Sequence, residues 1–306
     1  MRIVIVGPGA MGCLFASLLT EAEYDVVLLD KDPQRARVIL KQGILVETNH
    51  RTRNVHMSVT GTPEEIGTAD FVCLCVKSFD TRSAIQHAAS LVGPRTIVVS
   101  VQNGLGNAEE LSRVVDTAKI VCAVTSQAST SLGVGHIRHT GTGMTSAAPF
   151  QRAGRHAPAF ARILRFAGVQ TEVLDDAAAM IWAKLIVNAA VNPVAAIEGV
   201  SNGEILNRPK LRETAFAAAR EAASVAQAKG IRLPYSDATE EVEKVCRATA
   251  ANFSSMLQDM CNGRQTEVEA INGAIVREAR ALKVPVPMNK MLLAKVRSSK
   301  RQKVCR

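Results

Sequence analysis

Short apolar runs alternate with helix-like stretches in the first half of this chain. The runs are rich in β-branched residues and lie at Ile3–Val6, Val26–Leu29, Phe71–Val76, Thr96–Ser100 and Ile120–Val124. Strands with such continuous apolar sequence are buried on both faces, as in a parallel sheet covered by helices. The stretches between them supply the crossover helices, at Met11–Glu21, Pro33–Lys41, Thr81–Leu91 and Ala108–Val115. The pattern therefore predicts an α/β fold with an N-terminal Rossmann-type doubly wound parallel sheet.

The pattern changes after a last apolar run at Val169–Leu174. From Asp175 onward the sequence is rich in Ala, Glu, Lys and Leu, with apolar positions at helical spacing. A chain of 306 residues is also longer than one hydrophobic core usually spans. We therefore expect two domains, residues 1–174 with the sheet and an all-helical C-terminal domain over residues 175–306.

The positive charge of the chain is concentrated near its C-terminal end. The formal net charge is +9, and the segment from Lys290 to Arg306 is basic and holds no Asp or Glu. A short basic end of this kind is usually solvated. The rest of the chain is nearly neutral and has neither a helix-turn-helix pattern nor an aromatic-rich basic surface. We therefore expect no nucleic-acid partner.

The cysteines and the hydropathy pattern indicate a cytoplasmic protein. The chain holds seven cysteines, an odd number without paired-motif spacing, which favours reduced thiols over a disulfide framework. Cys and His do not recur at the spacing of metal ligands, so no metal site is expected. No segment reads as long enough to span a bilayer, and the apolar start Ile3–Val6 runs into glycines instead of a signal-peptide core. We expect no association with a membrane.

A glycine-rich loop follows the first apolar run directly. It has the pattern Gly-x-Gly-x-x-Gly and precedes an amphipathic helix, the context in which this motif binds a dinucleotide. The first glycine permits a tight turn, the second lets the backbone approach a pyrophosphate, and the third lets helix and strand pack closely. The helix N-terminus would then face the phosphates. The candidate cofactor-binding residues of this loop are Gly7, Pro8, Gly9, Ala10, Met11 and Gly12.

Asp30 and Lys31, two further candidate cofactor-binding residues, give opposite indications. Asp30 ends the second apolar run, where a carboxylate can accept hydrogen bonds from both hydroxyls of the adenosine ribose, and this favours NAD. Lys31 comes next, followed by Arg35 and Arg37, and these cations can hold the 2′-phosphate of NADP if the carboxylate turns away. The residues alone leave both cofactors open.

Two polar residues follow strands of the predicted sheet. Lys77 comes after Phe71–Val76, and Asn103 comes after Thr96–Ser100. Both fall at the carboxyl edge of the sheet, where ligands of open α/β sheets bind. We therefore expect both to bind near the nicotinamide ribose and Asn103 to reach the substrate as well. Taken singly, each is more often an ordinary loop residue.

A row of polar side chains crosses an otherwise apolar helix of the second domain. Lys184, Asn188 and Asn192 recur at four-residue spacing, which puts them on one helix face. Their neighbours are Ala, Val, Leu and Ile, so the helix is expected to be buried. Because a buried amide without a partner costs roughly 1–3 kcal/mol, the row needs either a polar substrate or neighbouring backbone groups to satisfy it.

Another polar set lies further along in helix-like sequence. Asn252 and Ser255 would share a helix face at i, i+3. Glu267 converges with them only if Asn262-Gly263 bends the path of the chain. We take all three as candidate site residues.

The whole chain resembles the ketopantoate reductase family of the 6-phosphogluconate-dehydrogenase-like superfamily. The resemblance rests on the glycine loop and on Val76-Lys77, Gln102-Asn103-Gly104, Lys184–Pro193, Ser201-Asn202-Gly203-Glu204 and Ser254–Asp259 with Thr266-Glu267. It implies NADPH-dependent reduction of 2-dehydropantoate to (R)-pantoate, a step towards pantothenate and coenzyme A. The implied partner is therefore a small 2-oxo acid.

The resemblance also implies roles for single residues. The lysine matching Lys184 is the general acid that protonates the ketone oxygen, and the glutamate matching Glu267 supports it. The residues that hold the substrate match Asn188, Asn192, Asn202, Asn252 and Ser255. The positions matching Lys77 and Asn103 lie where cofactor and substrate meet.

Asp30 departs from the family pattern, because NADPH-selective members usually carry a cation without an acid at the end of the second strand. An NAD-dependent D-2-hydroxyacid dehydrogenase of the same family is therefore a rival interpretation. A non-catalytic dinucleotide-binding sensor is a remoter one, which the pair of Lys184 and Glu267 disfavours. Both a monomer and a homodimer are compatible with the Ala-rich stretch Thr214–Ala228, which can pack within one chain or between two.

Overall fold

The computed structural model describes residues 1–151 and 154–299. The chain divides into two compact units, Met1–Gln102 with Asn107–Ala177, and Asn103–Gly106 with Ala178 onward. The sequence predicts a simpler division into domains 1–174 and 175–306, and those bounds stay a prediction. Of the basic C-terminal segment, residues 300–306 lie outside the described residues.

The first unit is built on an eight-stranded sheet of order β12-β11-β8-β7-β6-β1-β2-β5. Six neighbouring strands, β8, β7, β6, β1, β2 and β5, are parallel to one another. Strand β11 runs antiparallel to β8. The predicted Rossmann-type sheet is confirmed, with one antiparallel pair added near its edge. The strands are β1 (Arg2–Val6), β2 (Asp25–Leu29), β5 (Ser58–Thr60), β6 (Phe71–Leu74), β7 (Ile97–Ser100), β8 (Ile120–Thr125), β11 (Thr145–Pro149) and β12 (Thr171–Val173).

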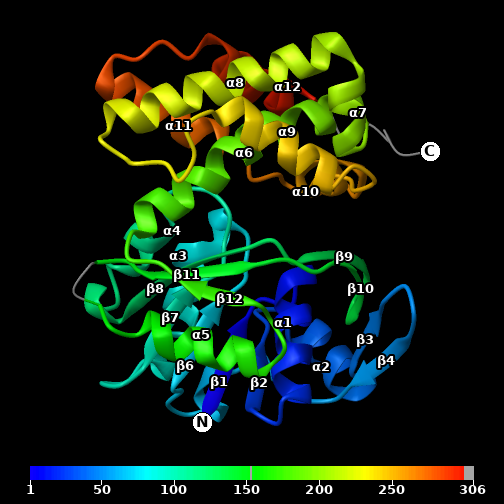
Figure 1. Cartoon of the computed structure of the whole chain (residues 1–306). Coiled ribbons are helices and arrows are strands. Elements are labelled where there is room, and N and C mark those ends of the chain that lie inside the picture. Colours follow the sequence, from blue (N-terminus) through cyan, green and yellow to red (C-terminus); the bar gives the residue numbers. More distant parts are fainter. Residues whose placement is uncertain (152–153, 300–306) are drawn as a thin grey trace. The chain divides into compact units, whose positions relative to one another are not determined.

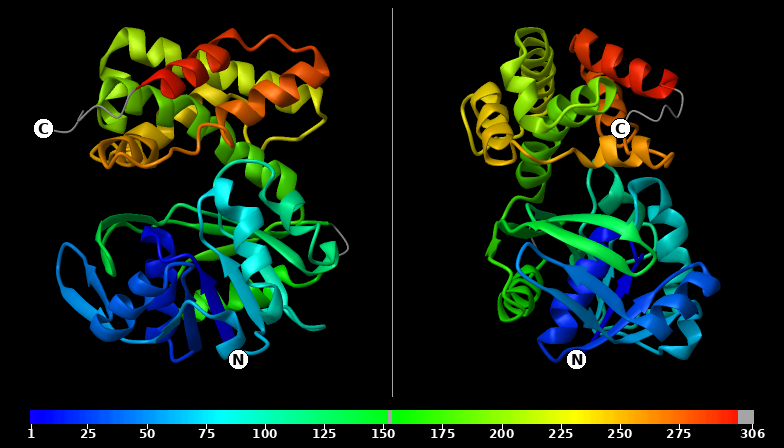
Figure 2. Two further views of the ribbon diagram at one scale, coloured as in Figure 1. Left: turned by 180° about the vertical axis from the view of Figure 1, so that it is seen from behind. Right: turned by 90° about the vertical axis from the view of Figure 1, so that its right-hand side faces the viewer.

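Helices cover both faces of this sheet (Figures 1 and 2). On one face, Ile3 and Ile5 of β1 share a hydrophobic cluster with residues of α1 (Ala10–Glu21), α2 (Pro33–Gln42) and α5 (Ala157–Phe166). On the other face, α3 (Thr81–His87) packs on β6 and α4 (Asn107–Leu111) packs on β8. Burial on two faces explains the continuous apolar sequence of the central strands.

A small second sheet in the same unit was not predicted. Its order is β4-β3-β10-β9, and all of its strands pack against α1. The strands β4, β9 and β10 are largely exposed or half-exposed and rich in Ser, Thr, His and Arg, whereas β3 has only the short apolar run Ile44-Leu45-Val46. Their bounds are β3 (Ile44–Glu47), β4 (Thr52–Val55), β9 (Ala128–Gly133) and β10 (His136–Gly141).

The second unit is helical, as predicted. Its longest helix, α6, contributes many residues to the core, and α8 packs against α7, α9, α11 and α12. The alanines of α8, among them Ala215, Ala218 and Ala222, are buried inside this unit. The helices are α6 (Ala177–Glu198), α7 (Asn202–Asn207), α8 (Pro209–Ala228), α9 (Ala238–Ala248), α10 (Ser255–Cys261), α11 (Asn272–Leu282) and α12 (Pro287–Ser298).

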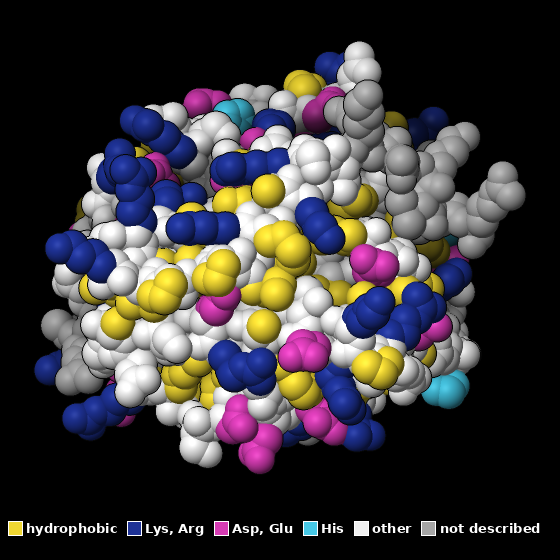
Figure 3. Space-filling model, turned by 90° about the horizontal axis from the view of Figure 1, so that it is seen from above, with side chains coloured by type: hydrophobic (Ala, Val, Ile, Leu, Met, Phe, Trp, Pro, Cys, Tyr) yellow, Lys and Arg dark blue, Asp and Glu magenta, His cyan; other side chains and the backbone are white. Residues whose placement is uncertain are grey.

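The surface of the molecule carries mixed charge on the face drawn in Figure 3. Lys and Arg side chains alternate there with Asp and Glu, and hydrophobic side chains gather between them. On this face the positive charge therefore does not form one continuous patch.

By length and composition α6 is able to cross a membrane, which the sequence analysis did not anticipate. However, 72% of its apolar window is buried inside the protein. Such burial is typical of the core helix of a globular unit. The expectation that no segment is long enough is therefore wrong for α6, although its apolar character is explained by the core.

The cysteines are mostly free thiols. Burial raises the pKa of Cys13, Cys75 and Cys122 to about 12 in each case. Cys73 and Cys246 are free as well, whereas Cys261 is disulfide-bonded. The prediction of reduced thiols is confirmed for the first five and wrong for Cys261. Among the described residues, no group of three or more His, Cys, Asp and Glu side chains is arranged to hold a metal ion.

Candidate active site

The glycine loop lies between β1 and α1 and packs against the loop that follows β6. Gly7 has a φ of +99°, and a Cβ at this position would lie 2.5 Å from Cγ1 of Val76. A Cβ on Gly12 would lie 1.9 Å from the carbonyl oxygen of Gly7. Both positions therefore require glycine. In the sheet order β1 lies between β2 and β6, so the loop sits at the switch point where open α/β sheets bind ligands.

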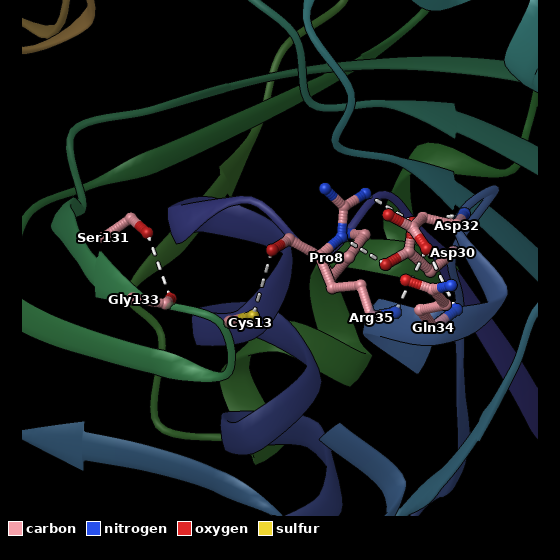
Figure 4. A network of polar contacts seen from close by, with 8 residues as sticks. All are labelled: Pro8, Cys13, Asp30, Asp32, Gln34, Arg35, Ser131 and Gly133. Atoms are coloured by element: carbon pink, nitrogen blue, oxygen red, sulfur yellow. Dashed lines mark hydrogen bonds and ion pairs between the residues drawn. The ribbon is translucent and has the colours of Figure 1, made fainter. Parts of the chain in front are cut away.

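The first turn of α1 is suited to a pyrophosphate. Gly9 caps this helix without a side chain, and Ala10 and Met11 begin it. A Cβ added at Gly9 would meet no atom of the described chain within 4 Å, so open space adjoins the N-terminal N–H groups. On the inner side, the carbonyl oxygen of Pro8 accepts a hydrogen bond from Cys13 Sγ at 3.4 Å (Figure 4). The loop residues therefore fit a dinucleotide.

Asp30 is fully buried and bonded to Arg35. Nε and Nη2 of Arg35 donate to the two carboxylate oxygens at 2.5 Å each, and the N–H of Asp32 donates to Oδ1 at 3.0 Å. The bond to Asp30 raises the pKa of Arg35 above its usual value. Lys31 is exposed and forms an ion pair with Asp80 at 3.0 Å. Asp30 and Lys31 are therefore each paired with a residue of opposite charge, Asp30 with Arg35 and Lys31 with Asp80. Neither pairing was predicted from the sequence.

Gln102 connects the two loops at the carboxyl edge of the sheet. Its Nε2 donates to the carbonyl oxygen of Val76 at 3.1 Å and to Oγ1 of Thr81 at 2.7 Å. Its Oε1 accepts from Oγ of Ser100 at 2.9 Å. The loop that carries Lys77 is therefore fixed by an amide that the sequence analysis did not single out. The signal was present, because Gln102 directly precedes Asn103 after a buried strand.

Asn103 begins a short segment that belongs to the helical unit. The N–H of Leu105 donates to the carbonyl oxygen of Ala270 at 3.0 Å. Gly104 has a φ of +86°, and a Cβ there would lie 2.7 Å from the Cβ of Ala270. Ala270 in turn donates its N–H to the carbonyl oxygen of Glu267 at 3.0 Å. The structure therefore holds the segment after Asn103 against the turn that carries Glu267.

Lys184 and Glu267 influence one another electrostatically in the helical unit. Burial on α6 lowers the pKa of Lys184 to about 8, and the negative charge of Glu267 acts in the opposite direction. Glu267 is itself buried, in the turn before α11. Asn188 and Asn192 follow Lys184 on the same helix, as predicted. A lysine with a pKa of about 8 can donate a proton near neutral pH, and the charge of Glu267 favours its protonated form.

The path to Glu267 bends where the sequence indicated. Helix α10 ends at Cys261 with Asn262 as its C-cap, and Gly263 has a φ of +64°. The prediction that Asn252 and Ser255 share a helix face is wrong, however, because α10 begins only at Ser255. Ser255 is exposed, whereas its neighbour Ser254 is buried and donates to the carbonyl oxygen of Asn192 at 3.3 Å. The polar N-cap preference of serine explains this start.

Asn202 and Asn252 are brought together by the backbone. The N–H of Asn202 donates to the carbonyl oxygen of Asn252 at 3.0 Å, and Asn202 Nδ2 donates to Oγ1 of Thr249 at 2.9 Å. The buried Oδ1 of Asn202 accepts no hydrogen bond from the described part of the chain. A buried amide oxygen left in this state is costly unless a ligand supplies a donor.

One unit therefore carries a dinucleotide-type glycine loop, and the other carries a half-buried lysine whose pKa is influenced by a buried glutamate. Together these features define a nicotinamide-dependent oxidoreductase of the two-domain class.

Comparisons with known proteins identify the family. Residues 3–152 match the model of the ketopantoate reductase PanE/ApbA family, and residues 176–300 match the model of its C-terminal domain. The 2-dehydropantoate 2-reductase of Archaeoglobus fulgidus is 37% identical over 297 residues, covering 97% of each chain. The crystal structure of a PanE/ApbA family ketopantoate reductase from Ralstonia eutropha JMP134 superposes with a TM-score of 0.88, at 33% identity and 97% coverage of each chain.

This chain belongs to the ketopantoate reductase family, and the predicted family and enzyme class are confirmed. The structure of D-mandelate dehydrogenase with NADH and anilino(oxo)acetate is also similar, with a TM-score of 0.90, 24% identity, and coverage of 97% of this chain and 98% of the other. At that identity the likeness concerns the fold alone. The fold is thus shared by enzymes with different substrates, and the choice among them depends on the site.

Proposed function

We propose that this chain is a 2-dehydropantoate 2-reductase that forms (R)-pantoate for pantothenate and coenzyme A biosynthesis. The names of relatives such as the Archaeoglobus fulgidus protein support this substrate. The observation that carries the proposal is Lys184, a half-buried lysine with a pKa of about 8 beside Glu267. A proton donor of this kind suits the reduction of a ketone.

A nicotinamide bound at this site would supply hydride to the ketone carbon. As charge develops on the ketone oxygen, the ammonium group of Lys184 stabilises it and then transfers a proton to it. Glu267 favours the charged form of Lys184 and so keeps the donor protonated near neutral pH. Without this carboxylate, burial alone would deplete the protonated form.

The amide side chains serve the substrate. In this proposal Asn188, Asn192, Asn202, Asn252 and Ser255 hold the hydroxyl and the carboxylate of a small 2-oxo acid. The unsatisfied Oδ1 of Asn202 is an acceptor for the substrate hydroxyl. A 2-oxo acid without a hydroxyl leaves this acceptor unpaired, which disfavours the rival D-2-hydroxyacid dehydrogenase activity.

The remaining residues serve the cofactor. Gly7 to Gly12 hold the pyrophosphate, and Lys77 with Asn103 binds near the nicotinamide ribose. The family expectation is NADPH, and NADH is the alternative that Asp30 suggests from the sequence. We further propose a cytoplasmic enzyme that acts as a monomer or a homodimer.

Initial rates of reduction test the proposal. Wild-type protein is supplied with 2-dehydropantoate or 2-oxoisovalerate, and with NADPH or NADH. We expect preferential turnover of 2-dehydropantoate and a loss of kcat by orders of magnitude in Lys184→Ala. Lys229→Ala, which removes an exposed lysine paired with Glu278, is the control and should keep full activity. Preference for 2-oxoisovalerate would support the rival dehydrogenase, and cofactor binding without any reduction would support the sensor.

A further inference from the structure

Asp30 occupies the position from which an acid usually binds the adenosine ribose of NAD. That role requires carboxylate oxygens that a ribose hydroxyl can reach. Here the side chain of Asp30 is 0% exposed. Both of its oxygens are already bonded to Arg35, and one also accepts from the backbone of Asp32. The carboxylate therefore faces Arg35 in place of a ribose.

Arg35 keeps part of its hydrogen-bonding capacity. A guanidinium has five N–H donors, and Asp30 takes up the one on Nε and one of the two on Nη2. The side chain of Arg35 is 37% exposed, and Figure 4 shows its third nitrogen pointing away from the carboxylate. The outer edge formed by Nη1 and Nη2 is thus available as a fork, the geometry with which arginine binds a phosphate.

The guanidinium is held rigidly at the end of β2. Asp32 caps α2 by accepting the N–H groups of Gln34 at 2.9 Å and Arg35 at 3.1 Å, and Pro33 follows the cap. Arg35 therefore sits in the first turn of a fixed helix, and its side chain is fixed again by Asp30. Lys31, the residue after Asp30, has a side chain that is 66% exposed and is paired with Asp80 at 3.0 Å.

We propose that Asp30 holds Arg35 in place as the ligand of a 2′-phosphate, so that the acid at the end of β2 selects for NADPH instead of NADH. Asp30 is then a positioning residue, and Arg35 is the residue that touches the cofactor. The inference rests on the proposed function, because it assumes that the glycine loop binds a nicotinamide dinucleotide. Considered alone, Asp30 at the end of β2 favours NAD, whereas the pair of Asp30 and Arg35 favours NADP.

Calorimetric binding of two small probes tests the proposal apart from catalysis. Adenosine 2′,5′-bisphosphate carries the 2′-phosphate, and 5′-AMP lacks it. We expect the wild-type protein to bind the bisphosphate about 10- to 100-fold more tightly, the range of one charge-assisted pair. The double variant Asp30→Asn/Arg35→Gln leaves no charge buried without a partner, and it should lose this preference while 5′-AMP affinity stays within about threefold.

Lys41→Gln is the matched control, because Lys41 is an exposed cation in the last turn of the same helix and its loss should leave the preference intact. Equal affinity of the wild-type protein for both probes would overturn the proposal, as would a double variant that retains the preference. Should the double variant unfold, Arg35→Lys keeps the charge but not the fork and should reduce the preference several-fold. A wild-type protein that prefers the bisphosphate yet reduces no 2-oxo acid would refute the proposed function and leave this inference standing.

Discussion

Asn272 takes the place of the N–H group that Pro193 lacks. Pro193 lies inside α6 and cannot donate to the carbonyl of Ala189, four residues earlier. Nδ2 of Asn272 donates to that carbonyl at 3.0 Å, and it also donates to Oδ1 of Asn289 at 3.1 Å. A side chain from α11 thus completes the backbone of the helix that carries Lys184.

Replacing Asn272 should therefore destabilise the helical unit. We expect Asn272→Leu to lower the free energy of unfolding by about 1–3 kcal/mol, the cost of leaving a buried carbonyl unpaired. In a Pro193→Ala background the loss should be smaller, because the restored N–H bonds to Ala189. Urea unfolding of the wild type, Asn272→Leu, Pro193→Ala and the double variant measures the loss of stability in each background. An equal loss in the two backgrounds would contradict the coupling, and Asn262→Ala, at an exposed amide, is the control.

The glycines of the first loop should separate folding from cofactor binding. Gly12→Ala places a Cβ against the Gly7 carbonyl, so we expect a lower melting temperature and little soluble protein. Gly9→Ala meets nothing within the described chain, so its melting temperature should stay near wild type. Its added methyl group should nevertheless weaken NADPH binding by about tenfold or more, because it fills the approach to the pyrophosphate. Normal NADPH affinity in Gly9→Ala would contradict the assigned phosphate site.

The pH dependence of the reaction should report Lys184. Its protonated form is the acid, so kcat/KM should be constant below the pKa and fall as the pH rises through about 8. The charge of Glu267 raises this pKa, so Glu267→Gln should shift the fall to lower pH. Glu269→Gln removes a neighbouring carboxylate that pairs with Arg297 and should leave the profile in place. A profile that does not move in Glu267→Gln would show that Glu267 does not act on Lys184.

Glu221 should stabilise the start of α12 from another helix. Its carboxylate, on α8, accepts the N–H groups of Met288 at 2.7 Å and Asn289 at 2.9 Å. These N–H groups have no intrahelical partner at a helix N-terminus. We expect Glu221→Ala to lower the free energy of unfolding by about 1–3 kcal/mol in denaturant titrations. Glu213→Ala, at an exposed position of the same helix, should cost far less.

The parts of the fold that were predictable share a simple physical cause. Strands such as Phe71–Leu74 are buried on both faces, so their sequence is continuously apolar, and α6 reveals itself by its length and spacing. Three strands of the small sheet are polar and half-exposed, and β3 pairs with β10 across a long sequence separation, so local pattern does not indicate the sheet. Its pairing depends on tertiary contacts with α1.

Parts of the candidate site could be predicted where a residue stands out by its own type and position. Lys184 and the glycine loop could be located from the sequence, because a lysine in an apolar helix and glycines after a strand are unusual. The partnership of Asp30 with Arg35 was not predictable, because it depends on the side-chain direction set by the first turn of α2. The same limit applies to Asn252, where the helix begins three residues later than its periodicity suggests.

The thiols of Cys13, which is buried, and Cys75, which is half-buried, lie near the glycine loop and bear on how the enzyme can be handled and inhibited. With a pKa of about 12, a thiol such as Cys13 or Cys75 is ionised in only about one molecule in 10⁵ at pH 7. Alkylating reagents and peroxides attack the thiolate, so both residues should resist iodoacetamide while the protein is folded. A covalent inhibitor directed at the dinucleotide site would therefore need a warhead for lysine instead of cysteine.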